Sequence, residues 1–493
     1  MTSRPREIIA PLAVITPTFA LGVVMAKWVE LSLWWWVVAV SVCMLIGVCL
    51  PKIRMVAVLV GVAALGGANL ALRQLDKPIP YDQTISATME IASAAEPASW
   101  GGLHADARII SWRDSSAITS RSNRLAKVTF ASDTIPPIGT RIKCRTKIRP
   151  IAPSRYADLM HSRGFVGYAT LSKYQPTGIN HTLRSRATEI QQAAIRRLEQ
   201  LRLPPDDRAV AEAMVLGYRR SLSQELRQEY ADTGASHLLA VSGLHVGIVF
   251  VLVNVLLLLL PALPYGHIIK NVIAVAMIWA VAFISGMSPS AVRAATMFSF
   301  VQAGLAMSLA HSPLNTICGA GLLMLVAWPE YLFDISFQLS FAAVLGITLW
   351  FPVAYDRVRS ESRVLNFVWS AVLAGICATV AVMPLTGYAF GQVSLPGVVL
   401  SPVVVGLAHI TLICGLVWCI APWEWWQGAA EAIISTSVGL QNDIVGATAR
   451  LPLCAVEWNP SATTVTTIYI AMIVATIALR YYVKPQTETI TFE

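Results

Sequence analysis

Apolar stretches close to twenty residues long recur along the chain with no charged side chain inside most of them. As helices rising about 1.5 Å per residue, stretches of this length cross a hydrocarbon core of ~30 Å. The stretches are residues 8–26, 31–50, 55–72, 238–260, 268–284, 291–309, 317–328, 335–351, 368–390, 398–420 and 463–479. Several are short or broken by Gly and Pro, which is tolerated only where the freed backbone groups face protein or water. The pattern predicts an α-helical polytopic membrane protein with about 10–11 transmembrane helices, of a kind typical of channels and transporters.

The period of the hydrophobic pattern changes from helical to alternating after residue 73. Five alternating runs, separated by Gly, Pro, Ser and Asp turn signals, are candidate strands. They are residues 84–92, 103–112, 125–131, 138–148 and 165–171. Five short strands predict a small barrel such as an OB-fold, so we expect a β-rich, OB-like domain inserted into the membrane protein.

The fourth candidate strand separates its side chains by chemistry, because successive side chains of a strand point to opposite faces. One face carries Ile138, Thr140, Ile142, Cys144, Thr146 and Ile148, and the other carries Arg141, Lys143, Arg145 and Lys147. The basic face is either an ordinary solvated surface or a groove that follows the phosphates of a single nucleic-acid strand. In the second case the stacking aromatic rings would come from Trp100, Trp112 and Tyr168.

A helical period returns after the predicted barrel. Residues 183–201 form an apolar stripe with arginines around it, as expected of a helix on a membrane surface. A second amphipathic stretch runs to Tyr218, and a third begins near Ser221, which has capping-box spacing to Gln224, and ends at the C-cap candidate Gly234. The predicted domains are the membrane segment 1–72, the OB-like domain 73–182, the amphipathic linker helices 183–233, the transmembrane channel domain 234–482 and the tail 483–493.

Composition and charge support a membrane protein. Of the 493 residues, 55% are hydrophobic and only 13% charged, against roughly a quarter charged in a soluble domain. The net charge of +9 suits a polyanionic partner, although basic loops beside membrane spans give the same sign. Basic pairs at residues 4–6 and 52–54 predict a cytoplasmic N-terminus and an extracytoplasmic OB-like domain. Of the eight cysteines, only Cys144 and Cys454 are expected to be exposed, so no disulfide framework is implied.

The densest polar group in an apolar setting lies at residues 234–247. Ionisable side chains cost several kcal/mol in lipid, so they tend to face a bundle interior or a pathway. His237, Ser242 and His245 therefore either line a path or, for the histidines, are satisfied by backbone carbonyls and only pack. Ser242 and His245 also suggest an alternative function, an intramembrane serine hydrolase, although no G-x-S-x-G elbow is present. A metal site is not expected, because the segment offers no further ligands at suitable spacing.

Two more segments place charge within the predicted membrane region. A helix capped by Ser290 is expected to hold Arg293 in its first turn, where a cation opposes the helix dipole. Arg293 either snorkels to the interface or faces a phosphate. Asp334 and Gln338 share one helical face with an aromatic ring. Asp334 is either an N-cap or an ion-pair partner of Arg293 across the bundle.

Taken together, these segments resemble the signature of the ComEC-type competence proteins, the DNA-internalization channels of naturally transformable bacteria. The resemblance begins with Leu-Gly-Tyr-Arg at residues 216–219 and Thr-Gly-Ala-Ser-His-Leu-Leu-Ala-Val-Ser-Gly-Leu-His-Val-Gly at 233–247. It also covers residues 155–159 and 163–165 before these segments and residues 285–297, 334–341 and 384–391 after them, so it extends in order along nearly the whole chain. It implies an extracytoplasmic OB-like domain, a membrane channel domain, and entry of one DNA strand while the other is degraded outside.

The chain departs from the family pattern at its C-terminal end. Many members carry a metallo-β-lactamase-like domain that is proposed to degrade the non-entering strand. Here about seventy residues follow Ile420, and no H-x-H-x-D-H motif appears. We therefore expect this chain to have no nuclease activity of its own.

The function expected from the sequence is an inner-membrane channel for single-stranded DNA in natural transformation, without a catalytic site, metal or cofactor. The candidate DNA-path residues are His237, Ser242, His245, Arg293, Asp334 and Gln338, with Arg141, Lys143, Arg145 and Lys147 on the basic strand. Expected partners are single-stranded DNA, the lipid bilayer, a DNA receptor, a cytoplasmic motor and a separate nuclease, with a homo-oligomer left open. The location expected is the bacterial cytoplasmic membrane, with several passes. The alternatives are an intramembrane serine hydrolase and a small-anion transporter on the same fold.

Overall fold

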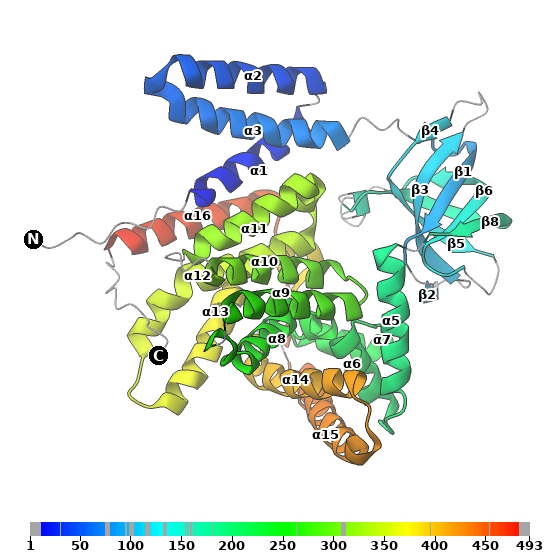
Figure 1. Ribbon diagram of the computed structural model, residues 1–493, viewed down its shortest axis with the longest axis vertical. Helices are drawn as coiled ribbons and strands as arrows, with labels where there is room; N and C mark the ends of the chain where they lie inside the picture. Colours follow the sequence, from blue (N-terminus) through cyan, green and yellow to red (C-terminus); the bar gives the residue numbers. More distant parts are fainter. Residues whose placement is uncertain are drawn as a thin grey trace, which may run out of the picture. The chain divides into compact units, whose positions relative to one another are not determined.

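The computed structural model describes most of the chain, and its elements are labelled in Figure 1. The described residues are 11–482 except 30, 74–78, 94–95, 98–102, 114–118, 132–135, 153, 155–156, 158–159, 162, 181, 263, 307–311, 395 and 453. The chain forms two compact units, which are described separately below. The first unit is Met1–Ile195 with Val249–Phe337, and the second is Arg196–Ile248 with Gln338–Glu493.

The first unit contains a closed five-stranded barrel. Its strands are β1 (Thr84–Ile91), β3 (Leu103–Arg113), β5 (Leu125–Phe130), β6 (Thr140–Arg149) and β7 (Phe165–Leu171), with short additions β2 (Glu96–Pro97), β4 (Thr119–Arg121) and β8 (Tyr174–Ile179). The order β1-β3-β5-β7-β6 closes because β6 also pairs with β1. The β5–β7 pair is parallel and the other pairs around the barrel are antiparallel. The five strands predicted from alternation are confirmed, with ends that differ by two residues at most.

Inward-facing side chains of these strands fill the barrel. The buried core is formed by Ile79, Ile85, Ala87, Met89, Ile91, Ala105, Ala107, Ile109, Trp112, Ala126, Val128, Phe130, Ile142, Cys144, Ile148, Ala169 and Leu171. Trp112 therefore packs in the core and is not a stacking surface, and Trp100 lies outside the described residues. The prediction that Cys144 is exposed was wrong, because it occupies an inward position of β6; burial raises the pKa of its thiol to about 11. Cys454 is buried as well, with its thiol against the carbonyl of Asp232.

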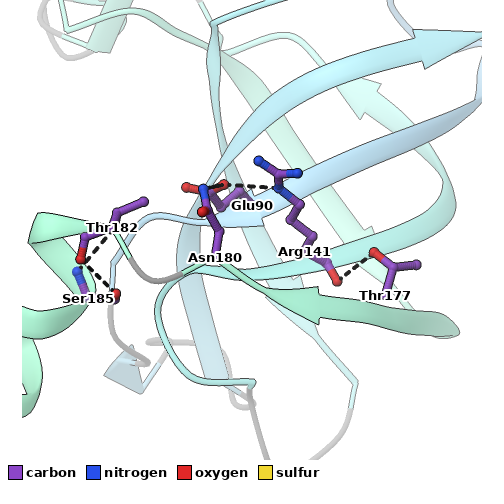
Figure 2. Close-up of polar contacts among 6 residues, drawn as sticks. All are labelled: Glu90, Arg141, Thr177, Asn180, Thr182 and Ser185. Atoms are coloured by element: carbon purple, nitrogen blue, oxygen red, sulfur yellow. Dashed lines mark hydrogen bonds and ion pairs between the residues drawn. The ribbon is translucent and has the colours of Figure 1, made fainter.

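Helices account for the rest of the first unit. They are α1 (Leu12–Trp28), α2 (Leu33–Cys49), α3 (Arg54–Arg73), α9 (Gly266–Ile284), α10 (Pro289–Ala306) and α11 (Pro313–Ala327), with 3₁₀ turns η1 (Pro51–Ile53), η3 (Leu260–Ala262) and η4 (Pro329–Phe333). The amphipathic helix α5 (Leu183–Leu198) follows the barrel, close to the predicted residues 183–201. A polar cluster fixes the end of β8 and the start of α5: the Asn180 amide donates to Glu90, and Ser185 bonds to Thr182 (Figure 2).

The second unit is helical apart from a two-stranded ribbon. Its elements are α6 (Pro205–Leu216), α7 (Gln224–Asp232), η2 (Ser236–Leu239), α13 (Arg363–Phe390), β9 (Gln392–Ser394), α14 (Gly397–Ile420), α15 (Glu424–Ala449), β10 (Ala455–Glu457) and α16 (Ala462–Tyr482). Helices α5, α8 (Gly243–Leu256) and α12 (Ile335–Val358) each begin in one unit and end in the other. Gly234 follows α7 with a φ of 74°, as predicted for its C-cap. The cap at its start is Ser223 and not Ser221, whose hydroxyl bonds to Glu212 instead.

Ten helices of the described chain are strongly apolar, in two length classes. Six are long enough to cross a membrane, namely Pro51–Arg73, Gly266–Ile284, Ile335–Val358, Arg363–Phe390, Pro402–Ile420 and Ala462–Leu479. The shorter ones are Leu12–Trp28, Leu33–Cys49, Gly243–Leu256 and Pro313–Ala327. These helices fit a membrane protein. Helix α15 was not predicted at all, although it has 26 residues.

Candidate nucleic-acid interface

The outer face of β6 is a ladder of basic side chains, as predicted. Along Thr140–Arg149 buried and exposed positions alternate without a break. The exposed positions are Arg141, Lys143, Arg145, Lys147 and Arg149. The sequence analysis therefore assigned the two faces of this strand correctly, and Arg149 extends the ladder by one base.

One end of the ladder is neutralised and the remainder is not. Arg141 Nε lies 3.4 Å from Glu90 Oε2 on the facing strand β1, and Asn180 donates to the same oxygen at 3.1 Å (Figure 2). Among the described residues, the other four bases of the ladder form no ion pair. The charge available to a ligand therefore lies at Lys143, Arg145, Lys147 and Arg149.

Hydroxyl side chains stand beside these free bases. In the antiparallel β1–β6 pair, Lys143 faces Thr88, Arg145 faces Ser86 and Lys147 faces Thr84. Directly opposed residues of such a pair share one face of the sheet. Cations alternating with hydroxyl groups are the side chains that proteins use to hold phosphate oxygens. The outer face of β1 and β6 is thus chemically suited to a sugar–phosphate backbone.

Three tyrosines, Tyr81, Tyr168 and Tyr174, pair with residues of β6, and of these Tyr81 is the exposed one. Tyr168, named from the sequence as a stacking ring, packs against the small cluster of Ile151, Ala157, Met160 and Phe165. Tyr81 forms an isolated bridge with Ile148 of β6 and is 44% exposed. It is the best placed of the three for stacking on a base. The sequence analysis missed Tyr81 because it precedes the first strand and shows no alternation.

The pair Ser242 and His245 closes the first turn of α8 as a reciprocal cap. The backbone N–H of His245 donates to Ser242 Oγ at 3.4 Å, and the backbone N–H of Ser242 donates to His245 Nδ1 at 3.2 Å. This is the geometry of a capping box, with histidine in the place of the usual glutamate. The Ser242 hydroxyl thus accepts a bond from the backbone of His245 and is not presented to its ring. The arrangement supports a helix cap more than a nucleophile and its base.

Three histidines are electrostatic neighbours in the second unit. His237 and His409 both interact electrostatically with His245, which is fully buried. His237 Nδ1 bonds to the carbonyl of Gly234 at 3.1 Å, as the packing interpretation requires. The Nε2 atoms of His245 and His409 are buried without a partner among the described residues. A hollow with room for about one water molecule lies beside His237. The sequence analysis missed His409, although a lone ionisable residue in the apolar run 398–420 was the signal to look for.

We expect Ser242→Ala to lower the melting temperature of the purified protein, because losing an N-cap costs about 1 kcal/mol. Ser242→Asn, which also caps well, should melt like the wild type. A fluorophosphonate probe should label none of the three proteins. Labelling of the wild type that Ser242→Ala abolishes would show that the serine is a nucleophile and that the cap is not its whole role.

The first unit brings Arg293 and Asp334 into one electrostatic cluster, but without a direct ion pair. Arg293 is 4% exposed, so it does not snorkel to an interface. The cap of its helix is Ser288, which accepts the N–H of Ala291, and not Ser290. Asp334 caps α12 by accepting the N–H of Ser336 at 2.9 Å. Of the two alternatives offered by the sequence, the N-cap is confirmed, and the ion-pair partner is Arg163 at 3.6 Å and not Arg293.

The candidate path residues are divided between the two units. His237, Ser242 and His245 belong to the second unit, and Arg293 and Asp334 belong to the first. The half-buried Gln338 lies four residues after Asp334 in α12, where that helix passes from the first unit to the second. Within the described residues, no three His, Cys, Asp or Glu side chains are grouped to hold a metal ion. The candidate residues described above offer hydrogen-bonding groups and charged groups.

Comparison with known families decides the relationship. Residues 214–481 match the family described as Competence protein, which is more than half of the chain. The chain belongs to the competence protein family. The matched region of this family contains α8, α10 and the start of α12, and with them all six candidate path residues. The barrel lies outside the matched region.

Two relatives of this competence family protein extend the comparison. ComE operon protein 3 of Bacillus subtilis is 27% identical over 215 residues, which are 44% of this chain and 26% of the relative. An uncharacterized protein of Aquifex aeolicus is 34% identical over 143 residues, 29% of this chain and 33% of the relative. This chain therefore matches about a quarter to a third of the length of each. No solved structure matches the chain.

Proposed function

We propose that this protein is a multi-pass channel of the bacterial cytoplasmic membrane through which single-stranded DNA enters the cell during natural transformation. The observation that carries the proposal is the exposed ladder of β6, whose free bases alternate with the hydroxyl groups of β1. A strand with one negative charge per nucleotide is attracted by such a surface through release of its counterions. Membership of the competence family and the similarity to ComE operon protein 3 support the same role.

The barrel is, in this proposal, an OB-type domain outside the membrane. Its closed order β1-β3-β5-β7-β6, with one parallel pair, supports that assignment. OB-type barrels hold single strands by combining backbone-tracking charge with aromatic stacking. Here the ladder supplies the charge and Tyr81 supplies an exposed ring. The basic pairs at residues 4–6 and 52–54 favour an extracytoplasmic barrel, where incoming DNA arrives.

The channel itself would be formed by the apolar helices, without catalysis by this chain. The six long helices supply the spans, and their buried polar groups supply sites that a hydrated polyanion needs on its way. A DNA receptor, a cytoplasmic motor and a separate nuclease are the partners that such a channel requires. The cap geometry of Ser242 and His245 favours this role over an intramembrane serine hydrolase.

Deleting the gene from its host should abolish internalisation of labelled DNA, and a plasmid copy should restore it. Surface binding of double-stranded DNA should persist, because a separate receptor performs it. The matched test is binding of fluorescent oligothymidylate to the purified protein in lipid nanodiscs. Unchanged internalisation in the deletion strain together with no binding in nanodiscs would contradict DNA transport and leave a small-anion transporter as the better account.

A further inference from the structure

Arg293 is buried in a way that neither its helix nor its neighbours explain. It is the fifth residue of α10, near the end where the helix dipole disfavours a cation. Its side chain is 4% exposed, and its Nε has no hydrogen-bond partner among the described residues. A buried donor of a charged group is destabilising when it is left unpaired. The site therefore holds a buried cation whose Nε donor has no partner in the described part of the chain.

The carboxylate that acts electrostatically on Arg293 is already engaged by another arginine. Asp334, 6% exposed, accepts the backbone N–H of Ser336 and pairs with Arg163 Nε at 3.6 Å. Arg163 also donates to Ser336 Oγ at 3.2 Å. Arg293 interacts electrostatically with Asp334, which attracts it, and with Arg163, which repels it. Two guanidinium groups thus share a single negative charge.

The surrounding groups do not cancel this excess. Tyr331 of η4 is an electrostatic neighbour of both Arg293 and Asp334, and its hydroxyl can donate a hydrogen bond. Arg184 and Glu330 also act on Tyr331, with opposite charges. Asp106 and Arg108 act on Arg184 and again carry opposite signs. Among these described residues four arginines stand against three carboxylates, so the named groups carry one positive charge in excess.

We infer that Arg293, Arg163 and Tyr331 form a binding subsite for a phosphate group, with Asp334 as its exchangeable counterion. The inference rests on the proposed function for the source of the phosphate, the phosphodiester backbone of the entering strand. Arginine holds phosphate through paired N–H donors, which the free Nε of Arg293 begins to supply. When a phosphate arrives, Arg163 exchanges the carboxylate for it, and when the phosphate leaves, the ion pair with Asp334 forms again. Such competition keeps binding weak enough for the strand to move on.

The test measures binding of fluorescent oligothymidylate to the full chain in nanodiscs of zwitterionic lipid. Arg293→Gln should lower the affinity about tenfold and reduce the salt dependence by about one phosphate contact. Asp334→Asn should raise the affinity several-fold and slow dissociation, because the competing charge is gone while asparagine still caps α12. Lys52→Gln, which removes an exposed charge of η1, is the matched control and should bind like the wild type.

The outcomes separate this subsite from the proposed function. Wild-type affinity in both Arg293→Gln and Asp334→Asn would overturn the subsite, even if changes in the β6 ladder abolish binding and DNA transport stands. If the wild type ignores oligothymidylate but inorganic phosphate raises its melting temperature, and Arg293→Gln removes that shift, the subsite stands and DNA transport fails. A shift produced only by phosphatidylglycerol in the nanodisc, and lost in Arg293→Gln, would assign the same chemistry to a lipid headgroup. Because Asp334→Asn keeps the helix cap, its result holds even if Arg293→Gln does not fold.

Discussion

Replacing Lys143, Arg145 and Lys147 together with glutamine should weaken single-stranded DNA binding by about two orders of magnitude and abolish DNA uptake. Each phosphate contact to a single strand contributes about 0.7 to the slope of log affinity against log salt. Losing three contacts should therefore lower that slope by about 2, which titration at several salt concentrations measures directly. The barrel should stay folded, because all three side chains are exposed and the alternating core of β6 is untouched.

A matched variant removes the same charge from outside the barrel. Exposed bases also lie at the end of α12 and the start of α13, namely Arg357, Arg359 and Arg363. Their triple replacement with glutamine changes the net charge equally and should leave the affinity within about threefold of the wild type, because long-range attraction is screened at physiological salt. An equal loss in both triple variants would mean that DNA responds to the overall charge of the protein, and the ladder would no longer be its binding surface.

Local periodicity was sufficient to predict the barrel. Four of its five strands bury alternate residues throughout, and β3 does so as far as Ile109, so a pattern of period two was enough to predict their positions and the basic outer face of β6. Helix α15 was not predicted, because membrane helices were identified from long apolar runs and α15 contains many polar residues. That helix uses its polar side chains inside the second unit: Gln441 and Asn442 bond to Tyr230, and Ser437 bonds to Thr411. Polar side chains that form hydrogen bonds inside a helical bundle interrupt the apolar pattern from which a buried helix is predicted.

The candidate sites depended on features that the sequence shows less directly. Helix caps were misplaced by two residues at Ser221 and Ser290, because a second Ser lies two residues away at each helix start and residue type alone does not choose between them. The capping box of Ser242 and His245 was missed because histidine is not the usual residue at its fourth position. Arg163 and Asp334 are separated by 170 intervening residues, and one precedes a strand of the barrel while the other precedes a helix, so no local pattern connects them. Tertiary contacts of this kind have no periodic signature.

Gly22→Val should prevent α1 and α3 from packing and cost about 3 kcal/mol or more, the upper range for overpacking. A Cβ on Gly22 would lie 1.7 Å from the carbonyl oxygen of Ala63, and a Cβ on Gly66 would lie 2.2 Å from that of Phe19. Each helix thus presents a glycine to the backbone of the other, the close approach that small residues permit between membrane helices. We expect the variant to lose the monodisperse peak in size-exclusion chromatography in mild detergent, and its host to lose DNA uptake.

Gly375→Ala is the control for glycine replacement in an apolar helix. Gly375 lies within α13, and a Cβ there would meet no atom within 4 Å. Alanine should be neutral or should stabilise the protein by up to about 1 kcal/mol, because it is the better helix former. Since backbone atoms, unlike side chains, cannot rotate away from an added methyl group, Gly22→Ala should already lower the melting temperature measurably. If Gly22→Val has the same melting temperature as Gly375→Ala and the wild type, α1 and α3 are not in contact as described. In that case the predicted dependence of DNA uptake on Gly22 would fail with it.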